Sequence, residues 1–462
     1  MKIKKGLQAE VEITDLAYGG QGLARLGGMA VFVDQAVPGD RVRIRIFRKK
    51  KKYAEARIID LIQSSPHRIR PPCEYSGYCG GCKWQFLTYD QQLIYKRQHV
   101  KDSLEHIGGL KGVPVHDAVP SERIFGYRNK MEFSCSDRRW LLPHEMERND
   151  IDRGFALGLH VPGTFHKVLN TRKCLLQPDL GNQLMDEVRQ YIRTSKRPVY
   201  GLRSHIGFWR FLVLRHSVAH NQWMVNVVTA DDDRQAVQPL ANRLRERYPA
   251  VVSVVHNITA RKAGVAVGEI EHTLAGSDSI SDTISGFGFE ISANSFFQTN
   301  TRGAVLLYET VKEYAMLSGN ETVLDLYSGT GTIPILLSDH SKTIIGIEIV
   351  ESAVSDAEKN CHLNGVSNCR FIRGDIRSCL PQITQRPDVL IIDPPRAGMH
   401  KDVVKQVLEL DADRIVYVSC NPATMARDAQ MMQGRYRLEE VQPVDMFPHT
   451  HHVEAVARLN RI

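Results

Sequence analysis

Three features of exported or membrane-embedded proteins are missing from this sequence. It contains no run of about 18 apolar residues, so no helix that could cross a bilayer is predicted. The basic N-terminal segment MKIKKGLQAEVEI is not followed by an apolar stretch, so no secretory signal is predicted. The nine cysteines are an odd number in a chain without an export signal, which argues against a disulfide framework. We therefore expect a cytoplasmic protein without membrane contact, and a monomer as the default state.

The excess of positive charge is small over the whole chain but is concentrated in one segment. The formal net charge is +8 over 462 residues. Residues 41–52 read RVRIRIFRKKKK, and eight of them are basic. Such a run forms either a solvated cationic edge or a surface for a polyanion, and it is often part of a nucleic-acid patch. We expect this segment to contact nucleic acid.

Three successive patterns predict a multidomain α/β protein. Residues 1–62 hold short alternating runs between Gly- and Pro-rich turns, which is typical of a small β-barrel. Residues 63–285 contain a cysteine cluster, an amphipathic helix near 90–107 and several strand-like runs, which predict an α+β domain with an antiparallel sheet. Residues 286–462 alternate apolar strands with helices, as a doubly wound, Rossmann-like parallel sheet does.

Polar side chains stand where four strands of this last sheet are predicted to end, namely Asp325, Glu348, Asp393 and Cys420. Ligands of such sheets bind beyond the carboxyl ends of the strands, and an acidic residue after the second strand can accept the ribose hydroxyls of an adenosine cofactor. The first strand is followed by Gly-x-Gly, but Pro334 replaces the third glycine of a dinucleotide fingerprint. Ordinary turn chemistry is the alternative for any one residue. Together the four predict an S-adenosylmethionine-dependent methyltransferase.

Cys420, in the run SCNP, is a candidate nucleophile for methylating a pyrimidine. Uracil carbon 5 is a poor nucleophile, but a thiolate that adds to carbon 6 creates an enolate whose carbon 5 can attack a methyl sulfonium. The thiol pKa must then be lowered or offset, by basic groups or by the helix expected over 422–430. A base must also remove the carbon 5 proton. Glu454, just before a final strand, is the candidate base.

Two segments, one rich in histidine and one rich in cysteine, are candidate metal sites. The histidines of MFPHTHHVE lack the i, i+4 spacing of helical ligands, and Pro448 opposes a helix, so no metal is predicted there. Cys73, Cys79 and Cys82 have the spacing Cys-x5-Cys-x2-Cys, which differs from the Cys-x3-Cys-x2-Cys of radical enzymes. Spacing alone leaves zinc and an iron–sulfur cluster open, and it leaves Cys135 as a candidate for the fourth ligand.

Several motifs in order resemble the RNA uracil-5-methyltransferases, most closely the 23S ribosomal RNA type that carries an OB-like TRAM barrel and an iron–sulfur cluster. In the last third of the chain they are FFQTN (296–300), DLYSGTGT (325–332), GIEIV (346–350), DPPRAG (393–398), SCNP (419–422) and MFPHTHHVE (446–454). Residues 1–62 look like the TRAM barrel, and CEYSGYCGGCKWQ (73–85) looks like the cluster motif.

The resemblance implies a role for each matching residue. Cys420 would be the nucleophile and Glu454 the base that removes the proton. The contacts to S-adenosylmethionine would come from Gln298, Tyr327, Glu348 and Asp393, of which Gln298 also lies near the reacting base in the family. A [4Fe–4S] cluster would be held by Cys73, Cys79, Cys82 and Cys174, and would serve structure and RNA docking rather than redox chemistry. The helix near 90–107 would pack on the catalytic domain.

We therefore expect methyl transfer to carbon 5 of a uridine in RNA, with 23S ribosomal RNA as the substrate. The same chemistry on transfer RNA is the first alternative, although transfer-RNA members of the family typically lack the barrel and the cluster. A methyltransferase for exocyclic amines would carry an aromatic residue where Arg396 follows the prolines. A non-catalytic, RNA-binding iron–sulfur protein would not need the full set of site residues. The sequence does not identify the target nucleotide.

Overall fold

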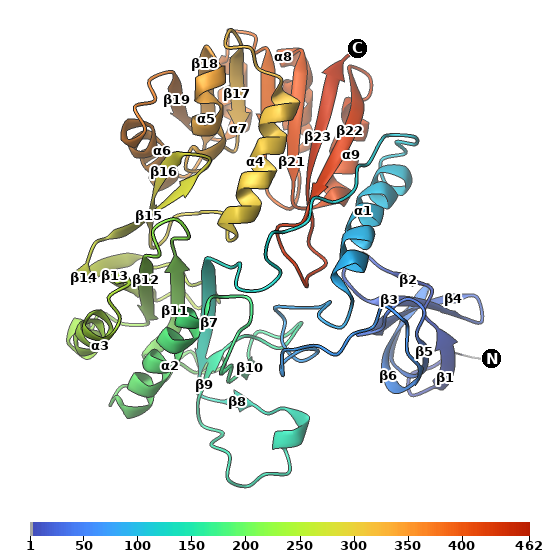
Figure 1. The fold of residues 1–462 in the computed structure, drawn as a ribbon, viewed down its shortest axis with the longest axis vertical. Coiled ribbons are helices and arrows are strands. Elements are labelled where there is room, and N and C mark those ends of the chain that lie inside the picture. The colour runs from blue at the N-terminus through green and yellow to red at the C-terminus, as the bar shows by residue number, and fades with distance from the viewer. Residues whose placement is uncertain (1–2) are drawn as a thin grey trace.

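The computed structural model describes residues 3–462 and divides into three regions (Figure 1). The first is a six-stranded sheet in the order β1-β5-β6-β4-β3-β2. Its strands are β1 (Gln8–Glu12), β2 (Asp15–Leu16), β3 (Gly22–Leu26), β4 (Met29–Asp34), β5 (Arg41–Lys49) and β6 (Tyr53–Gln63). Alternation along β5 buries Val42, Ile44 and Ile46 and turns the intervening arginines outward. The strand pattern of this region is the one expected from the sequence.

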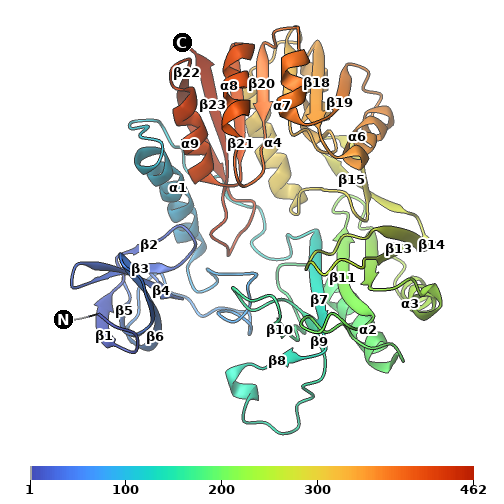
Figure 2. The same ribbon diagram turned by 180° about the vertical axis from the view of Figure 1, so that it is seen from behind.

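Helix α1 (Tyr89–His106) lies between the barrel and the C-terminal region, although the central region follows it in the sequence. Val100 and Leu104 of α1 share a core with Met425 and Ala426 of α9 (Pro422–Met432). Figures 1 and 2 both show α1 beside α9, between the barrel and the C-terminal sheet. The helix therefore packs on the C-terminal region, as the family resemblance implies.

The central region is built on a six-stranded sheet in the order β14-β13-β12-β11-β7-β9. Its elements are β7 (Lys130–Ser136), β8 (Arg139–Trp140), η1 (Pro143–Glu145), β9 (Ala156–Gly158), β10 (Val168–Leu169), α2 (Asp179–Thr194), β11 (Trp209–His216), β12 (Trp223–Thr229), α3 (Arg234–Arg247), β13 (Val251–Ile258) and β14 (Ile270–Gly276). The sheet predicted to be antiparallel is mixed, because β12 and β13 run parallel while its other strand pairs are antiparallel. Helix α3 provides the crossover connection that parallel neighbours require.

A two-stranded hairpin, β15 (Ser279–Ile284) and β16 (Phe287–Ser292), leads into the C-terminal region across the boundary predicted at 285/286. Its apolar face, with Ile284 and Phe289, shares a core with Leu307 of α4 (Thr301–Ala315). The hairpin thus joins the apolar core that underlies the C-terminal sheet.

The C-terminal region is a seven-stranded sheet in the order β19-β18-β17-β20-β21-β23-β22. Its elements are β17 (Thr322–Leu326), α5 (Thr332–Leu337), η2 (Ser338–His340), β18 (Thr343–Glu348), α6 (Glu351–Leu363), β19 (Cys369–Arg373), α7 (Ile376–Cys379), η3 (Leu380–Gln382), β20 (Val389–Ile392), α8 (Lys401–Leu410), β21 (Arg414–Ser419), α9, β22 (Tyr436–Val444) and β23 (Glu454–Arg461). Strands β17 to β21 are parallel, as predicted, while β23 runs antiparallel between β21 and β22.

This topology brings the carboxyl ends of β17, β18, β20 and β21 to one edge of the sheet, where a doubly wound fold binds its ligands. Gly331, at the start of α5, has φ +77°, and a Cβ there would lie 2.9 Å from both Ala357 and Phe371. Glycine is therefore required for the turn and for the close packing of α5. Among residues 3–462, no helix is long and apolar enough to span a membrane.

Candidate active site

Cys420 and Glu454 meet at one end of a pair of neighbouring strands. Strands β21 and β23 pair antiparallel up to Ser419 and Ala455, so Cys420 is the first residue after β21 and Glu454 is the first residue of β23 at the same end. The two groups are close enough for the Glu454 carboxyl to raise the pKa of the Cys420 thiol. The thiol is partly buried and the carboxyl is 6% exposed. A thiol and a carboxyl group can therefore act on the same bound base.

The electrostatics of the free protein keep these groups protonated. Burial raises the pKa of Cys420 to about 11, helped by Glu454 and opposed by the guanidinium of Arg396. Burial also raises the pKa of Glu454 to about 8, with Asp393 adding to the effect. The expectation that basic neighbours lower the thiol pKa is thus not met in the free protein. Burial is the largest cause, and among the charged neighbours Glu454 raises the pKa of the thiol while Arg396 lowers it.

A bound cation would favour the ionised forms of the buried carboxyl groups at this site. Asp393, directly after β20, has a pKa raised to about 7 by burial. Asp325, on β17, is buried with both carboxyl oxygens lacking a hydrogen-bond partner, and burial and Asp393 raise its pKa well above its usual value. Buried carboxyl groups without partners are costly unless a ligand supplies donors or positive charge. These carboxyl groups, as acceptors and negative charges, therefore fit the ammonium, sulfonium and hydroxyl groups of S-adenosylmethionine.

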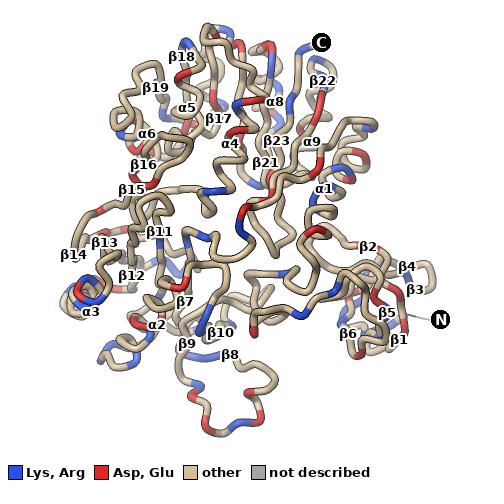
Figure 3. The backbone as a smooth tube through the Cα atoms, viewed as in Figure 1, with Lys and Arg blue, Asp and Glu red and all other residues tan. Residues whose placement is uncertain are grey.

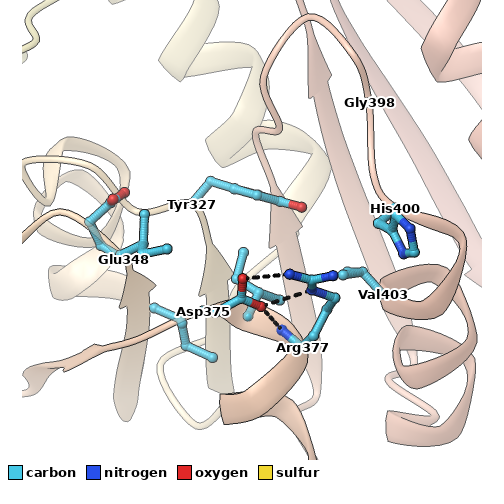
Figure 4. A pocket seen from close by; sticks show the side chains of 10 residues that line it. Tyr327, Glu348, Asp375, Arg377, Gly398, His400 and Val403 are labelled. Carbon is cyan, nitrogen blue, oxygen red and sulfur yellow. Dashed lines mark hydrogen bonds and ion pairs between the residues drawn. The ribbon is translucent and has the colours of Figure 1, made fainter.

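A cavity of about 320 Å³ opens beside these carboxyl groups, at the ends of β17, β18 and β19 (Figure 4). Tyr327 and Glu348 face it from one side. The Glu348 carboxylate accepts the N–H groups of Gly329 at 3.1 Å and Val350 at 2.8 Å, which fixes its position. Tyr327 has φ +67°, a strained conformation for a non-glycine residue that is typical of ligand sites. The cavity can hold an adenosine.

Two side chains that line this cavity, those of Asp375 and Arg377, were not predicted from the sequence. Asp375 follows β19, pairs with the Arg377 guanidinium at 3.0 and 3.1 Å, and accepts the Arg377 N–H at 2.9 Å. This pair forms the floor of the view in Figure 4. Asp375 stands at a strand end, so the argument that identified Glu348 could have found it as well. Arg377 carries no signal in the sequence.

The segment FFQTN delivers Gln298 to the other side of the site. Asn129 donates to the Gln298 carbonyl at 2.8 Å, and Asn300 caps α4 while its amide donates to the Met446 carbonyl at 2.9 Å. The Gln298 side chain lies beside the buried hydroxyl of Tyr308, which also faces Asp393 and Glu454. Tyr308 occupies an ordinary buried position of α4, so nothing in the sequence distinguishes it.

The loop before Glu454, residues 445–453, is held by α1. Lys96 and Asp445 form an ion pair in which both side chains are fully buried, and the Lys96 ammonium also donates to the Phe447 carbonyl at 3.0 Å. Gln92 accepts the His449 N–H at 2.8 Å. Burial lowers the pKa values of the three loop histidines to between about 3 and 4, so they are neutral near pH 7. The helix thereby fixes the approach to β23 and its first residue, Glu454.

The predicted cysteine ligands line one cavity, together with apolar residues. These cysteines are Cys73, Cys79, Cys82 and Cys174. Burial raises the pKa of Cys79 and of Cys82 to about 12, with the neighbouring thiols adding to it, and the Gly81 N–H donates to the Cys79 sulfur at 3.3 Å. Cys135 is buried in β7 and does not line the cavity.

The cavity does not present a site for a single ion. Within the described part of the chain, no three His, Cys, Asp or Glu side chains converge closely enough to hold one metal. A four-iron cluster takes each thiolate on a different iron and so holds the sulfurs farther apart than one ion does. Four thiols around an apolar hollow, with a backbone N–H directed at a sulfur, fit such a group.

The cysteine segment also touches the loop that precedes Glu454. The N–H groups of Lys83 and Trp84, directly after Cys82, donate to the His449 carbonyl at 2.9 and 3.0 Å. His449 has φ +65° and stacks on Phe125 at 4.3 Å. The four-cysteine site and the reaction site are therefore mechanically connected through one peptide group.

Several arginines of the basic segment 41–52 already form ion pairs with acidic residues of the barrel. Figure 3 shows its blue residues interleaved with acidic ones on the barrel. Arg43 binds Glu10 at 3.2 Å and Asp60 at 3.0 Å, Arg41 lies 3.6 Å from Glu10, and Arg48 lies 3.2 Å from Glu55. The exposed lysines 49–52 form no ion pair with any residue that the structure describes. The cationic surface is thus centred on the β5–β6 turn.

Comparison with known proteins gives consistent matches along the chain. A family model described as tRNA (Uracil-5-)-methyltransferase matches residues 179–378 and 384–462, and a TRAM domain model matches residues 4–59. An uncharacterised RNA methyltransferase of Chlorobaculum tepidum is 42% identical over 100% of this chain and 98% of its own length. One of Bacteroides thetaiotaomicron is 41% identical over 96% and 99%.

A solved structure also matches over nearly the whole chain. It is the Pyrococcus abyssi tRNA (uracil-54, C5)-methyltransferase in complex with S-adenosyl-L-homocysteine. It is 30% identical, with a TM-score of 0.76, and the match covers 98% of this chain and all of that one. Both the barrel and the C-terminal sheet therefore have counterparts in one known protein.

Proposed function

The chain belongs to the uracil-5 family of S-adenosylmethionine-dependent RNA methyltransferases, and from this premise we propose that it methylates carbon 5 of a uridine in 23S ribosomal RNA. The observation that carries the chemistry is that Cys420 and Glu454 meet at the same end of β21 and β23, on the sheet edge where a cavity suited to an adenosine opens.

We propose the following roles in the reaction. The Cys420 thiolate adds to carbon 6 of the uracil, and the electrons move to carbon 5 and the carbon 4 oxygen. Carbon 5 attacks the methyl group that S-adenosylmethionine supplies, and S-adenosylhomocysteine is left. Glu454 removes the carbon 5 proton, the double bond re-forms, and the Cys420 thiolate leaves. Arg396, beside the thiol, stabilises its anionic form.

The remaining site residues follow from the same proposal. Glu348 would accept the ribose hydroxyls, while Asp393 and Asp325 would face the positively charged part of the methyl donor. Tyr327 would cover the adenosine, and Gln298 would lie between the donor and the uracil. The fixed Glu348 carboxylate and the unpartnered Asp325 oxygens support this arrangement.

The pH dependence of donor binding tests this electrostatic arrangement. Asp393 and Glu454 have pKa values of about 7 and 8 in the free protein, so one or both hold a proton near pH 7. A sulfonium cation favours their ionised forms, so S-adenosylmethionine binding should release protons. Its affinity should rise with pH between pH 6 and 8, by up to about tenfold per pH unit for each proton released. Calorimetry in buffers of different ionisation enthalpy measures both quantities.

The matched control is S-adenosylhomocysteine, which has the same amino acid and adenosine but an uncharged sulfur. Its affinity should change less over the same pH range and release fewer protons. Equal pH dependence for the two ligands would contradict the placement of Asp393 beside the sulfonium.

Ribosomal RNA is proposed as the substrate because the barrel and the four-cysteine motif go with that type in the family resemblance. The Pyrococcus abyssi match favours the alternative, since a protein named for transfer RNA covers this chain from end to end. The expectation that transfer-RNA members lack the barrel therefore loses its force. Mass spectrometry of 5-methyluridine in both RNAs, with and without the gene, separates the two. Loss confined to transfer RNA would overturn the ribosomal assignment.

We also propose that Cys73, Cys79, Cys82 and Cys174 hold a [4Fe–4S] cluster. When bound, its irons would supply the positive charge that four buried thiols need in order to ionise. Iron and acid-labile sulfide in anaerobically purified protein should reach about four each per chain. Tightly bound zinc without sulfide would contradict the assignment.

Neutralising lysines 49–52 with glutamine should weaken RNA binding and leave cofactor affinity unchanged. Each lysine that contacts a phosphate releases counterions, so the slope of log affinity against log salt should flatten by up to about 0.7 per lysine. The control is Arg43→Gln, because Arg43 already pairs with Glu10 and Asp60 and should contribute little. An unchanged salt slope in the lysine variant would exclude this turn as an RNA contact.

A further inference from the structure

One residue of the N-terminal barrel reaches the reaction site. Tyr18 lies between β2 and β3, on a loop in which Gly19 and Gly20 have φ +119° and +88°. Its hydroxyl lies 3.5 Å from the Asn421 side-chain oxygen, and Asn421 directly follows Cys420. Its ring makes a T-shaped contact with the ring of His451, with 6.0 Å between the centroids. Tyr18 therefore stands between the two segments that carry the thiol and the carboxyl group.

The loop that carries Tyr18 is fixed from three directions. The Lys83 ammonium donates to the Gly19 carbonyl at 2.9 Å, the Trp84 indole donates to the Gly20 carbonyl at 3.2 Å, and His99 of α1 donates to the Leu16 carbonyl at 2.8 Å. Lys83 and Trp84 are the residues whose N–H groups also hold the loop before Glu454. The same short segment thus sets the distance between the barrel loop and the reaction site.

The ring of Tyr18 is nevertheless available to a ligand, because the residue is 43% exposed. Its two aromatic contacts, with His99 and His451, are T-shaped, with interplanar angles of 88° and 83°, and neither is a stacked pair. An aromatic face at the mouth of a site that takes a base out of its stack can replace the lost stacking. The hydroxyl contact with Asn421 is long and therefore weak. We therefore assign the function of Tyr18 to its ring rather than to its hydroxyl.

We propose that Tyr18 is a substrate-contacting residue whose ring packs against the target uracil and holds it over Cys420. This inference rests on the proposed function and extends it, since it makes the TRAM barrel part of the reaction site in addition to any role as an RNA tether. The barrel would then determine how the uracil is seated and not only how tightly the RNA is held.

The test compares Tyr18→Ala and Tyr18→Phe with wild type, using RNA that contains 5-fluorouridine at the target position. At saturating RNA, Tyr18→Ala should form the covalent adduct about 10- to 100-fold more slowly, whereas Tyr18→Phe should stay within about twofold of wild type. S-adenosylmethionine affinity and the melting temperature should not change in either variant. A structural role alone would lower the melting temperature and would not depend on the aromatic ring at saturating RNA.

Tyr53→Ala is the matched control, because Tyr53 is an aromatic residue of the same barrel that packs edge-on against Phe32. It should form the adduct at the wild-type rate. A wild-type rate in Tyr18→Ala, or a loss in Tyr18→Phe equal to that in Tyr18→Ala, would overturn the inference and leave the proposed function standing. Failure of the wild type to form any adduct would overturn both.

A second measurement does not depend on a substitution at Tyr18. RNA with 5-iodouridine at the target position forms photochemical cross-links to aromatic rings that stack on it. Irradiation of the wild-type complex should give a cross-linked peptide that contains Tyr18. A cross-link at other residues, without Tyr18, would contradict the proposed contact.

Discussion

Cys420→Ala should abolish RNA methylation, with a loss on the order of 10⁴-fold or more, as expected when a covalent nucleophile is removed. Without the thiol, no enolate forms, so carbon 5 of uracil is not nucleophilic enough to attack a methyl sulfonium. S-adenosylmethionine affinity should persist, because the cavity lined by Tyr327 and Glu348 does not include Cys420. Methyl transfer to RNA from labelled donor, with calorimetry of donor binding, measures both effects.

Cys369→Ala is the matched control for this substitution. Cys369 lies on β19, the edge strand of the same sheet, on the far side from β21. It should retain methylation near the wild-type rate, which would separate loss of a nucleophile from loss of any thiol in the domain. Methylation that survives in Cys420→Ala would favour transfer to an exocyclic amine, a reaction that needs no cysteine.

Glu454→Gln should stop the reaction one step later. The glutamine side chain is similar in shape to glutamate but cannot accept the carbon 5 proton, so the methylated base should stay attached to Cys420. Turnover should fall by roughly 10²–10⁴-fold, the usual contribution of a positioned general base. A covalent protein–RNA complex should accumulate with ordinary uridine RNA and should be visible by denaturing electrophoresis.

Glu439→Gln provides the comparison on the neighbouring strand. Glu439 lies on β22 and pairs with Arg437 at the surface, so its loss should change neither turnover nor the amount of adduct. If Glu454→Gln lost turnover without accumulating any adduct, Glu454 would act before the thiolate adds rather than after methyl transfer.

The strand-end residues could be predicted because the apolar runs are continuous and regular. Asp325, Glu348 and Asp393 follow from that pattern, since parallel strands present their carboxyl ends at one edge. The facing of Cys420 and Glu454 could not be derived from periodicity. It depends on β23 inserting antiparallel beside β21, and local sequence does not specify which strand a neighbour will be.

Other features required contacts between segments far apart in the chain. An apolar run such as β12 has the same sequence pattern whether its neighbour is parallel or antiparallel. The direction of β13 could therefore not be predicted from the sequence. Spacing identified Cys73, Cys79 and Cys82 but left the fourth ligand open. The family resemblance named Cys174, and the structure places it in the same cavity. The direction of the Cys420 pKa shift depends first on how far the fold buries the thiol, and then on the Glu454 carboxyl that β23 brings beside it. Tyr18 and Tyr308 have no local signal at all.

The central claim, covalent catalysis by Cys420 on a uracil, is tested most directly by mapping a trapped adduct. Protein incubated with S-adenosylmethionine and 5-fluorouridine RNA should stall after methyl transfer, because fluorine at carbon 5 cannot be removed as a proton. Digestion and mass spectrometry should then find one RNA-linked peptide, and it should contain Cys420. The absence of any adduct, or an adduct on another cysteine that persists in Cys420→Ala, would contradict the claim.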